Sequence, residues 1–206
     1  MSAVRTERPI VRRGGQHTRS EVQRVALELF TTQGYEATSL RQIADELGIN
    51  KASLYYHFAS KEAILLSLLE DRGAEAEHLL EWVRDQPRTP DLLESAVLRW
   101  VDSSSADKLR GTRFMAANPI VTRTLSATEG GRIGDSLKGL ADNLVSLLPS
   151  PTPRDVLLVR MAILSINAAI EASADAEFPD ADILAAAHDA AQALVDRLRA
   201  PREPES

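Results

Sequence analysis

The sequence contains no cysteine among its 206 residues. This absence excludes disulfide scaffolds, thiolate zinc sites and cysteine nucleophiles. The sequence also lacks a run of about 20 apolar residues, the length that a membrane-spanning helix needs. Its first residues lack the apolar core of a secretory signal. We therefore expect a cytoplasmic protein with no membrane partner.

Acidic residues outnumber basic residues in the whole sequence, but the excess of negative charge is unevenly distributed. The formal net charge is -6, which by itself argues against nucleic acid as a partner. Residues 1–60 nevertheless carry a net charge of +2, whereas residues 61–206 carry -8. Apolar residues make up 44% and charged residues 26%, as in a soluble globular protein. The sequence thus indicates a weakly basic N-terminal part and an acidic remainder.

Helix signals are clear in the basic part. Thr18 and Glu21 have the spacing of a capping box, and a helical stripe of apolar residues follows until Gly34. The stripe consists of Val22, Val25, Ala26, Leu29 and Phe30. A second capping pair, Ser39 and Gln42, predicts a short helix that Gly48 ends.

The remainder of the chain also shows helical periodicity. Asn50 and Ser60 are candidate N-caps of a third and a fourth helix. Sustained alternation with period two, as expected of strands, is not found. We expect further helices over residues 61–85, 91–103, 106–117, roughly 122–148, 154–173 and 180–200. The sequence therefore predicts an all-α protein.

The last two predicted helices carry more apolar surface than a surface helix of a monomer needs. The penultimate helix is apolar on nearly every side, and the last keeps a wide stripe with many alanines that permit close helix approach. Such helices suit either a thick monomer core or a four-helix bundle shared by two subunits. The pattern favours a homodimer formed through the last two helices, about 154–174 and 181–199.

Two short helices joined at Gly48–Asn50 match a helix-turn-helix plan, in which the second helix enters a DNA major groove. At 100° per residue, Leu54 and Phe58 mark the buried side of that second helix. The opposite side then carries small and amphipathic residues that are suited to phosphates and base edges. The four adjacent rings at 55–58 stand out, since only 4% of the chain is aromatic.

Residues 18–64 carry the residues "F...GY..TS...IA...G.....LYYHF.SKE", and in their order and spacing they resemble the DNA-binding domain of TetR-family transcriptional regulators. The resemblance implies a three-helix helix-turn-helix DNA-binding domain at 18–64. It also implies an α-helical ligand-binding and dimerisation domain at 65–200. We expect a flexible basic arm at 1–17, which either reaches a phosphate or the minor groove of DNA or is a disordered leader, and a disordered tail at 201–206.

The resemblance further implies a ligand-responsive homodimer that represses transcription from a palindromic double-stranded DNA operator until an unknown small-molecule effector binds. By position, the implied DNA-binding residues are Thr38, Ser39, Arg41, Lys51, Ala52, Ser53, Tyr55, Tyr56, His57 and Lys61. Leu54 and Phe58 are expected in the core. The residues implied for the effector pocket are Leu79, Trp82, Trp100, Phe114, Met115 and Asn118.

Catalytic and cofactor motifs are not recognisable in the sequence. Glu75 and His78 form a single Glu-x-x-His pair, whereas a di-metal bundle needs two such pairs and two further glutamates. We therefore expect neither a metal, a cofactor nor an enzyme. Arg99, Arg110 and Arg113 could pair with a carboxylate ligand or simply face solvent. Two other hypotheses stay open: a helical scaffold protein that has lost DNA binding, and a helical-bundle enzyme.

Overall fold

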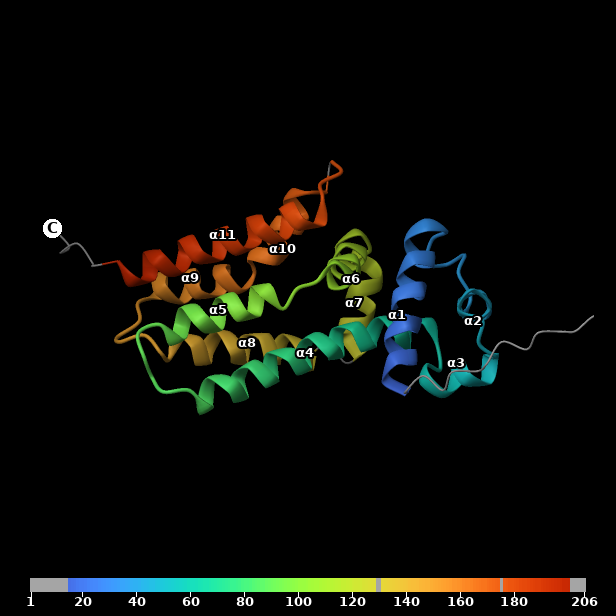
Figure 1. The fold of residues 1–206 in the computed structure, drawn as a ribbon, viewed down its shortest axis with the longest axis horizontal. Helices are drawn as coiled ribbons and strands as arrows, with labels where there is room; N and C mark the ends of the chain where they lie inside the picture. The colour runs from blue at the N-terminus through green and yellow to red at the C-terminus, as the bar shows by residue number, and fades with distance from the viewer. Residues whose placement is uncertain (1–14, 129–130, 175, 201–206) are drawn as a thin grey trace, which may run out of the picture. The chain divides into compact units, whose positions relative to one another are not determined.

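The computed structural model describes residues 15–128, 131–174 and 176–200, and each regular element in these ranges is an α-helix (Figure 1). The all-α prediction is confirmed. The chain forms two compact units, residues 1–64 and 65–206. The first unit contains α1 (Gly15–Thr32), α2 (Leu40–Leu47), α3 (Lys51–His57) and the first residues of α4 (Lys61–Asp85). The rest of α4 belongs to the second unit.

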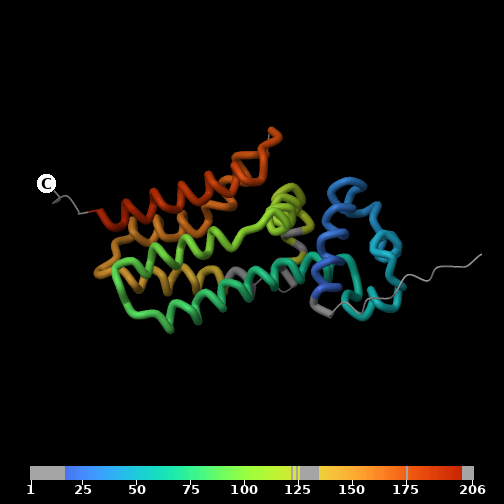
Figure 2. The backbone as a smooth tube through the Cα atoms, viewed as in Figure 1, coloured from blue at the N-terminus to red at the C-terminus, as the bar shows by residue number. Residues whose placement is uncertain are grey.

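Seven further helices complete the second unit. They are α5 (Leu92–Asp102), α6 (Ala106–Ala117), α7 (Pro119–Thr128), α8 (Gly131–Val145), α9 (Pro153–Ile163), α10 (Ser165–Ala172) and α11 (Asp180–Arg199). The last helix, α11, contacts α5, α9 and α10, and α8 packs against α9. Figure 2 shows the chain running back along α9 as α11. In the described residues no helix is both long and apolar enough to span a bilayer.

The core of the first unit is built as the apolar periodicity predicts. The stripe on α1 is buried, as are Ile43 and Ala44 of α2 and Leu54 of α3. Both predicted caps around the turn are present: Ser39 and Gln42 form a capping box, and Asn50 accepts a hydrogen bond from the amide of Ser53. Gly48 ends α2 at φ +64°, a conformation that a residue with a Cβ adopts only with strain. These local choices fix where α3 begins.

The start of α1 differs from the prediction. The helix begins at Gly15, so Thr18 lies inside it and does not cap it, and residues 15–17 of the predicted arm are helical. A capping pair satisfies amide groups at a helix end, but it does not stop a helix that can extend upstream through residues without proline. Residues 1–14 of the predicted arm and residues 201–206 of the predicted tail lie outside the described residues.

A cluster around Tyr35 ties the turn after α1 to the start of α4. The Tyr35 hydroxyl donates to Glu62 Oε1 at 2.7 Å. Lys61 Nζ donates to the backbone carbonyl of Tyr35 at 2.6 Å and lies 4.4 Å from the centroid of its ring. The hydrogen bond from Tyr35 lowers the pKa of Glu62, while burial and the same carboxylate raise the pKa of Tyr35. The cluster thereby joins the segment before α2 to the start of α4, which follows α3 in the chain.

The helix predicted over residues 122–148 is two helices. Its first half begins earlier, with Pro119 at the first position of α7, where the missing amide costs nothing. The second half, α8, begins at Gly131 and ends at Val145. Gly130 and Gly131 are adjacent in the sequence, and glycine is among the poorest helix formers. The single-helix prediction was therefore wrong in its continuity and in both ends.

The helix predicted over residues 154–173 is also divided, into α9 and α10, with Leu164 between them at φ -87° and ψ 2°. The indole Nε1 of Trp100 donates to the carbonyl oxygen of Ile163 at 3.1 Å. In a continuous helix that carbonyl would accept from the amide of Asn167, which bonds instead to the carbonyl of Leu164. A side chain that enters the backbone ladder in this way interrupts a helix.

The indole bond of Trp100 can be tested by its energy. Trp100 is 3% exposed. Replacing it by Phe leaves the carbonyl of Ile163 without this donor and leaves a small void, so Trp100→Phe should lower the free energy of unfolding by about 2 kcal/mol. Chemical denaturation at fixed protein concentration measures the change. Trp82→Phe is the matched control, because Trp82 is half-buried. Equal losses for the two variants would contradict a special role of the Trp100 bond.

The Tyr35 cluster generates a titration prediction. Because hydrogen bonding lowers the pKa of Glu62, the ionised carboxylate stabilises the fold above its unfolded pKa, and this stability is lost as pH falls through the lowered folded pKa. Tyr35→Phe keeps the ring under Lys61 but removes the donor, so the Glu62 pKa should rise. A carboxyl NMR titration measures it, with Tyr56→Phe as the control. An unchanged Glu62 pKa in Tyr35→Phe would refute this account.

Candidate nucleic-acid interface

The outer face of α3 is formed by residues that the core does not use. Leu54 is 0% and Phe58 is 2% exposed, as predicted, and they hold the helix onto the first unit. Tyr56, 86% exposed, points away from that core, and Tyr55 is 55% exposed. Two aromatic side chains this exposed are unusual on a protein surface unless they bind something.

Other residues of α3 share this exposed face. Lys51 and Ala52 are exposed, whereas Ser53 and His57 are half-buried. The His57 ring meets the Tyr56 ring edge to face, with centroids 5.2 Å apart, which restricts where the tyrosine hydroxyl can lie. The face therefore offers one ammonium group, two phenol groups, a hydroxyl and an imidazole beside a small side chain. These are the donors that phosphate oxygens and base edges accept from.

The start of α2 adds a second set of polar groups. Ser39 is exposed, but its hydroxyl already takes part in the capping box with Gln42. The Arg41 side chain is 71% exposed, and its nearest carboxylate is Asp45 at 3.6 Å, a loose surface pair. Arg41 is therefore available to a partner at little energetic cost.

Two of the predicted site residues are turned into the protein. Thr38 is 2% exposed, and its hydroxyl donates to the carbonyls of Gly34 and Leu29. Lys61 is half-buried and is held by Tyr35 as described above. In this conformation both side chains fix the geometry of the turn and do not lie on the exposed face of α3.

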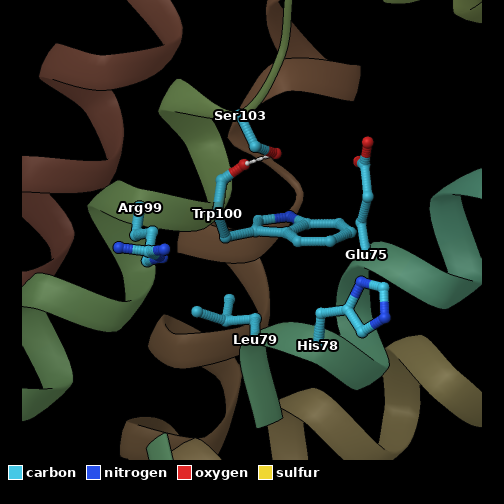
Figure 3. Close-up of a pocket in the computed structure, with 6 residues that line it drawn as sticks. All are labelled: Glu75, His78, Leu79, Arg99, Trp100 and Ser103. Carbon is cyan, nitrogen blue, oxygen red and sulfur yellow. Dashed lines mark hydrogen bonds between the residues drawn. The ribbon is translucent and has the colours of Figure 1, made fainter. Parts of the chain in front are cut away.

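A pocket of about 180 Å³ lies between α4 and α5 in the second unit (Figure 3). Two of the residues predicted for an effector site, Leu79 and Trp100, line it. Phe114 and Met115 are core residues outside its lining, Asn118 bonds to the carbonyl of Phe114, and the Trp82 ring is covered by Arg99. The other lining residues are Glu75, His78, Arg99 and Ser103.

The sequence prediction missed most of this lining because it selected aromatic and apolar residues. A usable signal was present: Glu75, His78 and Leu79 share one face of α4 at helical spacing, and Arg99, Trp100 and Ser103 have the same kind of spacing on α5 and its C-cap. The Glu75 carboxylate pairs with Arg72 and Lys108. Within the described part of the chain, no three potential metal ligands gather.

Comparison with known proteins agrees with the helix-turn-helix geometry. Residues 24–68 match the family model described as "Bacterial regulatory proteins, tetR family". The transcriptional regulator TcmR of Streptomyces glaucescens is 34% identical over 113 residues, which cover 52% of this chain and 49% of TcmR. The transcriptional repressor KstR2 of Mycolicibacterium smegmatis is 35% identical over 99 residues, 48% of this chain and 40% of KstR2. The chain thus matches about half the length, or less, of these curated relatives.

A solved structure extends the likeness of the fold to the second unit. The ketosteroid transcriptional regulator KstR2 of Mycobacterium tuberculosis superposes with a TM-score of 0.60 over 88% of this chain and 92% of that one, at 20% identity. These matched proteins are transcriptional regulators and not enzymes. With the helix-turn-helix motif, the family model and the fold in agreement, residues 24–68 of this chain form a helix-turn-helix region of the TetR family of bacterial regulatory proteins.

Proposed function

We propose that this protein is a dimeric transcriptional repressor in the cytoplasm, which binds a palindromic operator through α3 and releases it when a small molecule occupies the second unit. The observation that carries the proposal is the division of α3 into a buried side and an exposed aromatic face, with Tyr56 86% exposed. The match to this family supports the same conclusion, because the matched relatives are DNA-binding regulators.

The DNA contacts follow from the exposed face. Tyr55, Tyr56 and His57 donate to phosphate oxygens, while Ala52 and Ser53 approach base edges, where a small side chain accommodates a thymine methyl group. Lys51, Arg41 and Ser39 contact the flanking backbone. Thr38 and Lys61 act as positioning residues, because their side chains are engaged within the first unit.

A homodimer forms through α9, α10 and α11. Leu157, Met161 and Leu164 are 58%, 55% and 47% exposed and recur at the helical spacing of one face. On α11, Ala186, Ala190 and Ala193 are exposed with the same spacing. Three large apolar side chains on one face beside a row of alanines suit a four-helix bundle, in which each copy contributes the same surface.

Release would follow from a change in the separation of the two α3 helices. In the DNA-bound dimer they must lie about 34 to 36 Å apart, or further by whole helical turns. An effector that binds better to a dimer with another separation shifts the population toward it. The loss of operator affinity equals the effector's preference for that state and cannot exceed it.

The exposed face of α3 is tested with an operator selected from random double-stranded DNA. Tyr56→Ala should weaken retardation of that operator by about tenfold or more, because it removes a hydroxyl donor and a ring from the contact surface. Ile120→Ala is the matched control, since Ile120 is 81% exposed on α7. Undiminished binding by Tyr56→Ala would overturn the assignment of this face.

The dimer face is tested by placing a charge on it. Met161→Glu puts a carboxylate at the centre of the proposed apolar interface, where it would be buried without a partner. The variant should sediment as a monomer in analytical ultracentrifugation and lose most of its operator affinity, since one subunit reaches one half-site. Ile120→Glu carries the same charge outside the interface and should remain dimeric. A dimeric Met161→Glu protein would exclude this face.

A further inference from the structure

Most hydrogen-bonding groups that line the pocket between α4 and α5 are already bonded to other groups of the protein. The Trp100 indole N–H is taken by the carbonyl of Ile163, and the Arg72 guanidinium lies 3.5 Å from the centroid of the indole ring. The Ser103 hydroxyl donates to the carbonyl of Trp100 at 2.7 Å and accepts from Arg72 at 2.9 Å. Trp100 and Ser103 therefore offer a ligand contact area and not unused donors.

The negative charge in the pocket is already compensated. Glu75 pairs with Arg72 at 2.8 Å and with Lys108 at 2.5 Å. Burial lowers the pKa of Arg72, but the hydrogen bond from Arg72 to Glu75 opposes this and favours the charged pair. Two cations around one carboxylate leave an excess of positive charge beside the indole. A cationic ligand would meet this excess, and Glu75 is not free to balance it.

Arg99 is the charged group of the lining that remains available. Within the described residues no carboxylate pairs with it, and its guanidinium lies 4.8 Å from the centroid of the Trp82 ring. Stacking on a ring holds the guanidinium while leaving its N–H donors free in the plane, which suits bidentate binding of a carboxylate. Figure 3 shows Arg99 and His78 on either side of Leu79, with the indole of Trp100 above Leu79 and His78.

The remaining walls are apolar. Leu79 is 6% and Trp100 is 3% exposed, so each presents a small apolar area to the pocket. The volume of about 180 Å³ is below the roughly 300 Å³ at which pockets for drug-sized ligands begin. A small planar body fits such a space, and a second ring system would need the pocket to widen.

We propose that this pocket is the effector site and that its ligand is a small aromatic carboxylate, with the carboxylate on Arg99 and the ring between Leu79 and Trp100. This inference rests on the proposed function for its regulatory meaning, but the binding itself does not depend on DNA. His78, an exposed residue of α4, lines the opposite side of the pocket from Arg99. Positive charge, an apolar wall and limited volume together select this class against cations and neutral polar molecules.

The test uses benzoate and cinnamate as probes, each with its neutral amide, titrated calorimetrically into the full-length protein without DNA. One of the two acids should bind saturably at one site per chain, and its amide should bind at least about tenfold more weakly. Arg99→Gln should weaken binding of the acid by about tenfold or more, and Arg99→Lys should retain part of it. Arg84→Gln, an exposed arginine of α4 outside the pocket, is the control and should bind as the parent does.

Equal binding of acid and amide would overturn the proposal, as would undiminished binding by Arg99→Gln or the absence of saturable binding by both acids. Circular dichroism of each variant establishes that it is folded. Operator retardation without any acid is measured on the same preparations. Failure of that retardation speaks against the repressor function alone, whereas failure of the titration with intact retardation speaks against the effector class alone.

Discussion

The hydrogen bond from the Trp100 indole to the carbonyl of Ile163 organises the second unit. A buried N–H needs an acceptor, and here it takes one from the backbone of another helix. That acceptor is lost to the helix ladder, so α9 ends at Ile163 and α10 begins at Ser165, with Leu164 between them. The same ring lies under Arg72 and lines the pocket. One side chain thereby sets a helix break, the position of a half-buried cation and the wall of a cavity.

The break does not disrupt the surface on the other side of these helices. Backbone bonds of the α type run from Leu164 to Arg160 and from Ala168 to Leu164, so the helical phase is nearly kept across the interruption. Leu157 and Met161 before the break and Leu164 at the break consequently share one exposed face. The inner side of α9 and α10 can adapt to Trp100 while the outer side stays regular enough to pair with a second copy.

The sequence was sufficient wherever local rules decide the structure. Ser39, Asn50 and Gly48 act within their own turns, and the phase of α3 follows from the burial of Leu54 and Phe58. The division at Leu164 could not be predicted, because its cause lies 63 residues away in Trp100. The lining of the pocket was predicted only in part, because it too depends on residues that are far apart in the sequence. Its wall at Leu79 and Trp100 is apolar and recognisable, but the engagement of Glu75 by Lys108 depends on tertiary contacts.

The motif that identifies the family combines residues with two physical roles. Tyr56 and Lys51 are exposed. Thr38 and Lys61 are polar side chains of the kind that contact DNA, but here they donate hydrogen bonds to backbone carbonyls of the first unit. The cations left on α2 and α3 are thus Arg41 and Lys51, two per subunit within the described residues.

In the proposed DNA complex, these two cations of α2 and α3 would by themselves release few counterions. Neutral donors such as the exposed tyrosines would add contacts that salt does not screen in the same way. In the proposed dimer, pairing through α9, α10 and α11 would double both kinds of contact and make the second half-site an intramolecular one. Under that proposal the sparse charge of α3 and the exposed apolar face of α9 are complementary, because weak binding by one α3 is compensated by joining two of them.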